Sequence, residues 1–132
     1  MPADHVADRI EIMELVALAS RYMDERKPEQ WADLFTADGT MVGSTGETKG
    51  RDALVALATK MGGGGVHTTN GSTIEIDGDT ARHEATVVVF TRAKAGELHH
   101  ARLVARYEDV LHRTEQGWKL HHRQIIQHYR DA

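Results

Sequence analysis

Four consecutive glycines at positions 62–65 constrain the fold of this chain more than any other feature of its sequence. Each glycine loses more backbone entropy on folding than any other residue, so a helix cannot continue through the run. The residues before the run have helical periodicity, whereas the residues after it alternate polar and β-branched side chains. The sequence therefore predicts a helical front half and a strand-rich back half. His67 falls where the first strand after the run begins, a kind of position that often carries a catalytic side chain.

The composition limits the chain to a few functional classes. Its 132 residues, 40% hydrophobic and 27% charged, have the length and make-up of one soluble domain, which we expect to span residues 1–132. The absence of cysteine excludes disulfides, thiol nucleophiles and thiolate metal sites. A net charge of -4 without a lysine or arginine cluster argues against nucleic acid as a partner. Because we find neither a long apolar run nor a signal peptide, we expect a cytoplasmic protein that does not bind membranes.

The front half contains three predicted helices. The first covers residues 3–25, and its expected buried face consists of four apolar residues at helical spacing: Val6, Ile10, Met13 and Ala17. The same rhythm places Asp24 on this face, where a carboxylate needs a partner unless the end of the helix frays. A second helix is predicted from Pro28 to residues 37–39, and a third at 51–61, with a short strand at 40–42 and a polar turn between them.

The back half has the pattern of an antiparallel meander. Strands are predicted at 73–76, 80–92, 98–112 and 118–128. Alternation in the third of these strands predicts a core face of Ala101, Leu103, Ala105, Tyr107 and Leu111. The opposite face, which we expect to be wet or dimer-facing, contains Arg102, Val104, Arg106, Glu108 and His112. Together the elements predict an α+β fold with helices packed on one face of a strongly curved, mostly antiparallel sheet.

Several short motifs, in order along nearly the whole chain, resemble the SnoaL-like branch of the nuclear transport factor 2-like superfamily. The motifs are Leu34–Gly39, Gly50–Leu54, His67–Asn70, Asp77–Ala81, Tyr107–Asp109 and Gly117–Leu120. The resemblance implies a cone-shaped α+β barrel around a deep pocket, usually a homodimer through the outer face of the sheet. Within the superfamily the chain is most similar to scytalone dehydratase and hexachlorocyclohexane dehydrochlorinase, which eliminate water or HCl without a metal or organic cofactor.

The resemblance also implies a set of catalytic residues. Asp24 matches the aspartate that pairs with a catalytic histidine, and Arg123 matches an arginine of the same pocket. His67 is the candidate histidine, but it stands three residues before Asn70, where the family pattern has four. Because a one-residue shift turns a strand side chain to the other face, the sequence leaves open whether His67 faces the pocket. If it does, Asp24 would orient His67 as a base, and Arg123 or Asn70 would stabilise the developing anion.

Two classes of function are compatible with these residues. The first is a cofactor-free lyase or isomerase acting on a small, largely apolar substrate, either cyclic or resembling a polyketide or steroid. The second is a non-catalytic module that binds a small ligand or serves only in dimerisation. The expected ligand-binding residues are Tyr22, Asn70, Leu103 and Tyr107.

The nine histidines do not predict a metal site. His99 and His100 are adjacent, as are His121 and His122, and adjacent residues of a strand point to opposite faces. Each pair could therefore offer only one ligand to a metal ion, and the His-x-His spacing that suits strand-borne metal sites is missing. We expect neither a metal nor a cofactor.

Overall fold

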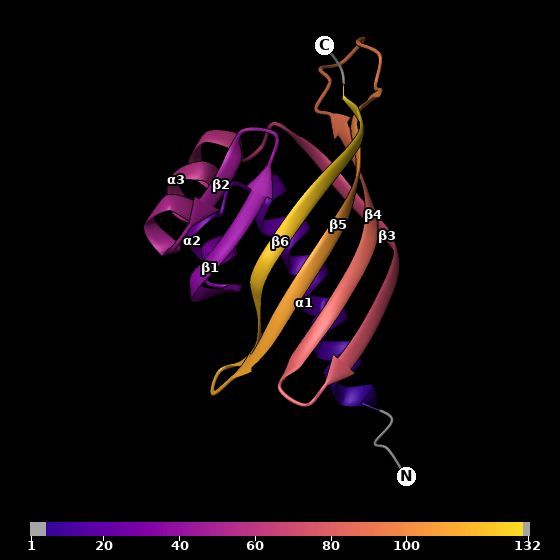
Figure 1. Cartoon of the computed structure of the whole chain (residues 1–132). Helices are drawn as coiled ribbons and strands as arrows, with labels where there is room; N and C mark the ends of the chain where they lie inside the picture. Colours follow the sequence, from indigo (N-terminus) through magenta and orange to yellow (C-terminus); the bar gives the residue numbers. More distant parts are fainter. Residues whose placement is uncertain (1–4, 131–132) are drawn as a thin grey trace.

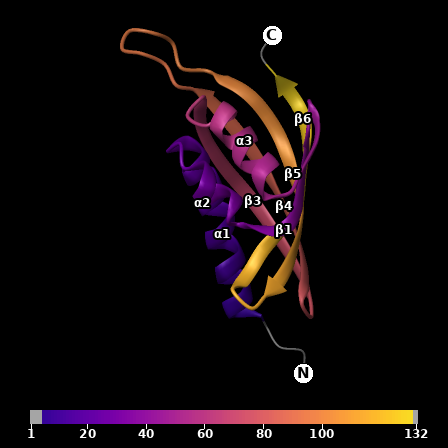
Figure 2. The same ribbon diagram turned by 90° about the vertical axis from the view of Figure 1, so that its left-hand side faces the viewer.

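Three helices pack on one face of a six-stranded sheet in the computed structural model, which describes residues 5–130. The helices are α1 (Val6–Asp24), α2 (Pro28–Ala32) and α3 (Arg51–Met61). The strands are β1 (Phe35–Gly43), β2 (Gly46–Lys49), β3 (Gly65–Asp77), β4 (Thr80–Thr91), β5 (Ala101–Thr114) and β6 (Gly117–Arg130). Figure 1 shows the strands side by side, and Figure 2 shows the helices together on one side of the twisted sheet.

The strand order confirms the predicted α+β fold with a mostly antiparallel sheet. The order is β2-β1-β6-β5-β4-β3, and β1 and β6 form the parallel pair. The sheet is curved but not closed, since β2 and β3 lie at its two edges rather than pairing with each other. Along residues 5–130, none of the helices combines the length and the apolar content that a membrane span requires.

Helix α1 buries a different face from the one that its sequence predicts. Its buried residues are Ile12, Leu15, Val16, Ala19 and Met23. The predicted face was wrong, because Val6, Ile10 and Met13 are 52–54% exposed. Polar contacts at the start of the helix help to fix its rotation: Arg9 donates to the carbonyl of Ile74 on β3, and Glu11 accepts from the backbone N–H of Trp118 on β6.

The second predicted helix is shorter than expected. Helix α2 ends at Ala32, and the chain enters β1 at Phe35, so residues 37–39 lie in a strand instead of ending a helix. The backbone N–H of Leu120 donates to the carbonyl of Leu34, and Phe35 pairs in register with Leu120. Parallel pairing with the distant strand β6 therefore overrides the local helical pattern.

Two strand pairs near the upper end of the sheet in Figure 1 contain β-bulges. Between β4 and β5, Val89 pairs with Leu103 and Phe90 with Ala101, so Arg102 is an extra residue on β5. Between β5 and β6, Val104 pairs with Tyr129 and Ala105 with Gln127, so His128 is an extra residue on β6. Each bulge interrupts the strict alternation of faces on which the sequence prediction depended.

Candidate active site

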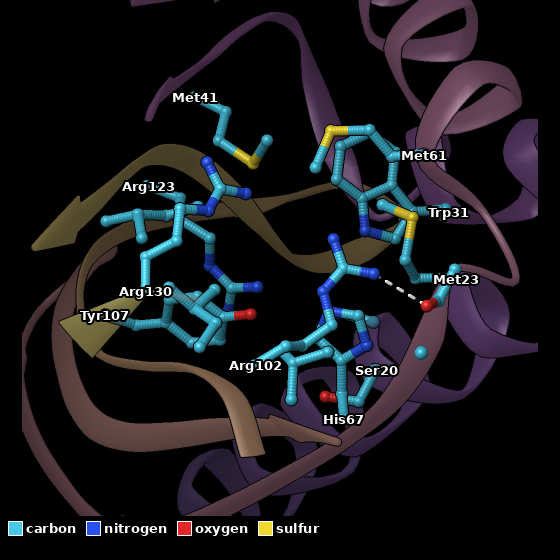
Figure 3. Close-up of a pocket in the computed structure, with 16 residues that line it drawn as sticks. Ser20, Met23, Trp31, Met41, Met61, His67, Arg102, Tyr107, Arg123 and Arg130 are labelled. Atoms are coloured by element: carbon cyan, nitrogen blue, oxygen red, sulfur yellow. Dashed lines mark hydrogen bonds between the residues drawn. The ribbon is translucent and has the colours of Figure 1, made fainter. Parts of the chain in front are cut away.

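A cavity of about 90 Å³ lies between the helices and the inner face of the sheet. Its walls are largely apolar, with Met23 and Trp31 on the helix side and Met41 and Leu103 on the sheet side, whereas its arginines all come from the sheet (Figure 3). The polar lining residues include Ser20, His67, Arg102, Tyr107, Arg123 and Arg130. An adjoining outer hollow of about 380 Å³ shares the walls formed by Met41, Met61 and Leu103, so the cavity opens through it towards solvent.

Asp24 and His67 meet at the wall of this cavity. The Nδ1 atom of His67 lies 2.6 Å from Oδ1 of Asp24, and the backbone N–H of His67 donates to Oδ2 at 2.9 Å. Their side chains are 19% and 15% exposed, respectively. Since an ionised carboxylate only accepts hydrogen bonds, this contact places the proton on Nδ1 and leaves Nε2 of the neutral ring with a free lone pair.

The glycine run at residues 62–65 positions His67 at the wall of the cavity. The backbone N–H of Gly63 donates to the carbonyl of Met23 at 3.0 Å, which ties the run to the end of α1. Gly63 has a φ of +75°, and a Cβ on Gly65 would lie only 2.6 Å from the carbonyl oxygen of Phe90. Larger residues would therefore be strained or would clash here. The sequence left open whether His67 faces the pocket, and in the structure His67 is among the residues that line the cavity.

Arg123 lies in the same cavity wall but belongs to a buried polar network. Its Nε and Nη2 atoms donate to the two oxygens of Asp109 at 2.8 and 3.0 Å, and its guanidinium lies 3.8 Å from the ring centroid of Tyr107. His83 bonds through Nδ1 to Asp109 at 2.8 Å and through Nε2 to Ser72 at 2.9 Å. Arg123 is therefore held rigidly, with its charge largely compensated by Asp109.

Burial and charge act in opposite directions on this network. Burial favours the neutral form of Asp109, but the Arg123 guanidinium and the His83 ring outweigh it and lower the pKa of Asp109. Burial raises the pKa of Tyr107, so its hydroxyl stays protonated at neutral pH. The sequence prediction did not identify Asp109 and His83. Alternation along β5 could have shown that Asp109 shares the core face with Tyr107 and Leu111.

The expected ligand-binding residues divide into two groups. Leu103 and Tyr107 line the cavity, whereas Tyr22 and Asn70 are not among its lining residues. Tyr22 is half-buried against the main core, with Lys27 Nζ 5.9 Å from its ring centroid. Asn70 is exposed on β3, opposite Thr86. Asn70 is thus poorly placed to stabilise an anion beside His67.

Arg102 lies on a different face of β5 from the one that its sequence predicts. Alternation assigned it to the outer face with Arg106 and Glu108, but its side chain lines the cavity beside Leu103. The bulge at Arg102 explains this difference, because an extra residue re-aims the side chains around it. Arg130 was not identified because it lies beyond the predicted end of its strand.

Two histidines outside the cavity, His112 and His121, contact each other. The rings of His112 and His121 stack with their centroids 3.9 Å apart, and burial together with His121 lowers the pKa of His112. Within the part of the chain that the structure describes, no cluster of three or more His, Asp or Glu side chains could hold a metal ion.

The chain matches a family model described as a SnoaL-like domain over residues 4–124. No curated protein matches it. Among solved structures, it is similar to a nuclear transport factor 2-like protein with a cystatin-like fold from Novosphingobium aromaticivorans, with a TM-score of 0.85 and 28% identity over 93% of this chain and 83% of that one. A protein of unknown function from Mycobacterium tuberculosis has a TM-score of 0.84 and 25% identity over 92% and 76% of the two chains.

A proposed scytalone dehydratase from Novosphingobium aromaticivorans also has this fold. Its TM-score is 0.80 at 20% identity, with 93% of this chain and 85% of that chain covered. At this identity the similarity establishes the fold alone.

Proposed function

The chain belongs to the SnoaL-like family, and we propose that it is a cofactor-free lyase or isomerase that removes a proton from a carbon atom of a small, largely apolar substrate. The observation that carries this proposal is the hydrogen bond of 2.6 Å between Asp24 and His67 at the wall of a cavity. A carboxylate at Nδ1 fixes the tautomer in which Nε2 can accept a proton. The family includes polyketide cyclases and dehydratases, which makes a reaction of this class reasonable.

His67 is the proposed base. Its Nε2 atom takes the proton from a carbon that is acidified by a neighbouring carbonyl, and Asp24 stabilises the imidazolium that forms. In a lyase the electron pair left on carbon expels a leaving group from the next carbon. In an isomerase the proton returns to a different carbon. A positioned base contributes typically ~10²–10⁴-fold, so the remaining acceleration has to come from stabilisation of the developing anion.

Arg123 is the proposed stabiliser of that anion. Two of its nitrogens bond to Asp109, which leaves Nη1 for a substrate oxygen. The rigid pairing supports this role because a donor that is already oriented needs no reorganisation during the reaction. Met23, Trp31 and Leu103 provide apolar walls that suit a substrate with a ring or a hydrocarbon body.

Exchange of the α-hydrogens of a simple ketone for deuterium tests the proposal. The substrate is 2-tetralone in D2O, and NMR follows the incorporation of deuterium beside its carbonyl. We expect the wild-type protein to catalyse exchange and H67Q to lose about 10²–10⁴-fold of the rate. H99Q is the matched control, because His99 is exposed and lies outside the cavity lining. Binding of the ketone without catalysed exchange would instead favour the non-catalytic ligand-binding module.

A further inference from the structure

We propose that the outer hollow of the cavity binds a carboxylate group of the substrate, and that Arg102 and Arg130 are the main residues of this anion subsite. Both line the inner cavity and also the outer hollow of about 380 Å³. Lys60 lines the outer hollow as well. The inference rests on the proposed function, since it describes the substrate of the same site as a small apolar molecule that carries an acid group.

The backbone of β5 is irregular where Arg102 points into the cavity. In a regular strand Arg102 would face away from Leu103, because neighbouring side chains alternate. Val89 pairs with Leu103 and Phe90 pairs with Ala101, so Arg102 has no partner residue on β4. As a result Arg102 and Leu103 both line the cavity.

A second bulge, on β6, brings the side chain of Arg130 to the cavity side of the sheet as well. Ala105 pairs with Gln127, and regular pairing would then place Tyr129 opposite Leu103. The extra residue at His128 shifts the register by one, so that Leu103 pairs with Arg130 instead. Residues directly opposite each other share a face of the sheet, which brings Arg130 to the cavity side. Bulges of this kind often re-aim side chains next to active sites, and here two of them direct arginines to one opening.

Arg102 and Arg130 form no ion pair with an acidic side chain among the residues that the structure describes. Arg102 donates to the carbonyl of Gly64 at 2.7 Å, and Arg130 donates to the hydroxyl of Ser44 at 3.2 Å. Both acceptors are neutral. Within residues 5–130, the ion pairs formed by lysine and arginine involve other residues: Lys27, Arg51, Arg106, Arg113 and Arg123.

The lining of the outer hollow contains no aspartate or glutamate among the described residues. This concentration of positive charge contrasts with the net charge of -4 of the whole chain. Like charges that lie close together repel, and a bound anion would relieve that repulsion. Figure 3 shows the side chains of Arg102, Arg123 and Arg130 around the cavity. Arg123 bonds to the carboxylate of Asp109, whereas Arg102 and Arg130 donate to neutral acceptors.

The geometry favours a carboxylate on an apolar body. A guanidinium presents a planar fork of donors that matches a carboxylate, and the bond is about twice as strong as one between neutral groups. Met41, Leu103 and Ile125 line both the inner cavity and the outer hollow, so an apolar path leads from the arginines towards His67. A ligand anchored by its acid group at the opening would extend its apolar part to the proposed base.

Calorimetric titration with a matched pair of probes tests the subsite. The probes are 3-phenylpropanoate and its neutral analogue 3-phenylpropanamide, which differ in charge but hardly in shape. We expect the wild-type protein to bind the carboxylate about ten-fold more tightly, the effect of one charge-assisted hydrogen bond. The preference should weaken as salt is added, because the opening is exposed to solvent.

The double variant R102Q/R130Q should bind both probes equally, whereas R82Q should keep the wild-type preference. Arg82 is the matched control because it is exposed on β4 and lies outside both hollows. Circular dichroism and thermal unfolding check that the double variant is folded. Equal binding of the two probes by wild type, a preference retained in R102Q/R130Q, or no measurable binding of the carboxylate at millimolar concentration would each overturn the proposal.

The variant H67Q separates this inference from the proposed function. We expect it to lose hydrogen exchange but to keep the preference for the carboxylate, since His67 is not among the residues that line the outer hollow. A preference for the carboxylate without catalysed exchange in wild type would refute the proposed function and leave the anion subsite standing. Catalysed exchange in a wild-type protein that does not prefer the carboxylate would refute the anion subsite and leave the proposed function standing.

Discussion

Replacing Asp109 with asparagine should destabilise the protein strongly, although the two side chains have almost the same shape. The Asp109 carboxylate accepts two hydrogen bonds from Arg123 and one from His83. The side chains of Asp109 and Arg123 are 0% and 3% exposed. In D109N the amide nitrogen replaces one accepting oxygen, and the buried guanidinium loses its counter-charge.

The expected size follows from this burial. Removing one partner of a buried ion pair costs about 3–5 kcal/mol, because the remaining charge is left without compensation in a low dielectric. That is a large part of the ~5–15 kcal/mol by which a domain is typically stable. For a chain of this length the melting temperature should fall by about 10–20 °C. Urea unfolding followed by circular dichroism, at a fixed protein concentration, measures the free energy of unfolding directly.

The adjacent residue provides a control on the same strand. Glu108 pairs with Arg106 at 2.7 Å, but these side chains are 39% and 44% exposed. Solvent screens such a pair, so E108Q should cost no more than about 1 kcal/mol. The comparison holds the strand and the kind of ion pair fixed and changes the burial.

The effect of D109N should also depend on pH with a definite sign. Arg123 and His83 lower the pKa of Asp109 in the folded state despite the opposing effect of burial. The stabilisation by ionised Asp109 is therefore fully present above the unfolded-state pKa of about 4, and it is lost as the pH falls through the lower folded-state pKa. The difference between wild type and D109N should be largest near neutral pH and narrow below about pH 4. A cost for D109N similar to that of E108Q, or a difference that does not change with pH, would refute this reasoning.

Two further pairs of variants test the packing. I12A should lower the free energy of unfolding by about 2–5 kcal/mol, because Ile12 is fully buried. I10A should change it by no more than about 0.5–1 kcal/mol, because Ile10 is 54% exposed. Equal costs for the two variants would contradict the observed buried face of α1. G65A should lower the free energy of unfolding by about 1–3 kcal/mol, since the added Cβ would lie 2.6 Å from the carbonyl oxygen of Phe90. G43A should change it by no more than about 0.5 kcal/mol, because the nearest atom to its added Cβ would be 3.9 Å away. Chemical unfolding measures all four, and a neutral G65A would show that β3 can move without loss.

Local signals in the sequence predicted much of the fold. The glycine run separates the helical half from the sheet, and α3 has its predicted bounds, Arg51–Met61. Periodicity identified α1 as a helix but not its buried side, because apolar residues occur on more than one face. The early start of β1 at Phe35 depends on pairing with β6, which is far away in the sequence and leaves no local signal.

The candidate site was likewise predictable in part from the sequence. The motifs pointed to Asp24, His67 and Arg123, and all three side chains lie at or beside one cavity. The placement of Arg102 could not be read from the sequence, because a bulge changes the face of a residue without any change in composition. The register of His67 was open for a related reason: four glycines allow several paths, and contacts with Met23 and Phe90 select one of them.

The protonation of the His67 ring tests the central claim most directly. Long-range proton–nitrogen NMR spectra distinguish a ring that carries its proton on Nδ1 from one that carries it on Nε2. With the neutral ring in the wild-type protein, we predict a proton on Nδ1, bonded to Asp24, and a bare Nε2. In D24A the spectrum should change to that of a ring exchanging between both forms. A proton on Nε2 in wild type, or a His67 spectrum that D24A leaves unchanged, would contradict the Asp24–His67 pair as a proton-abstracting unit.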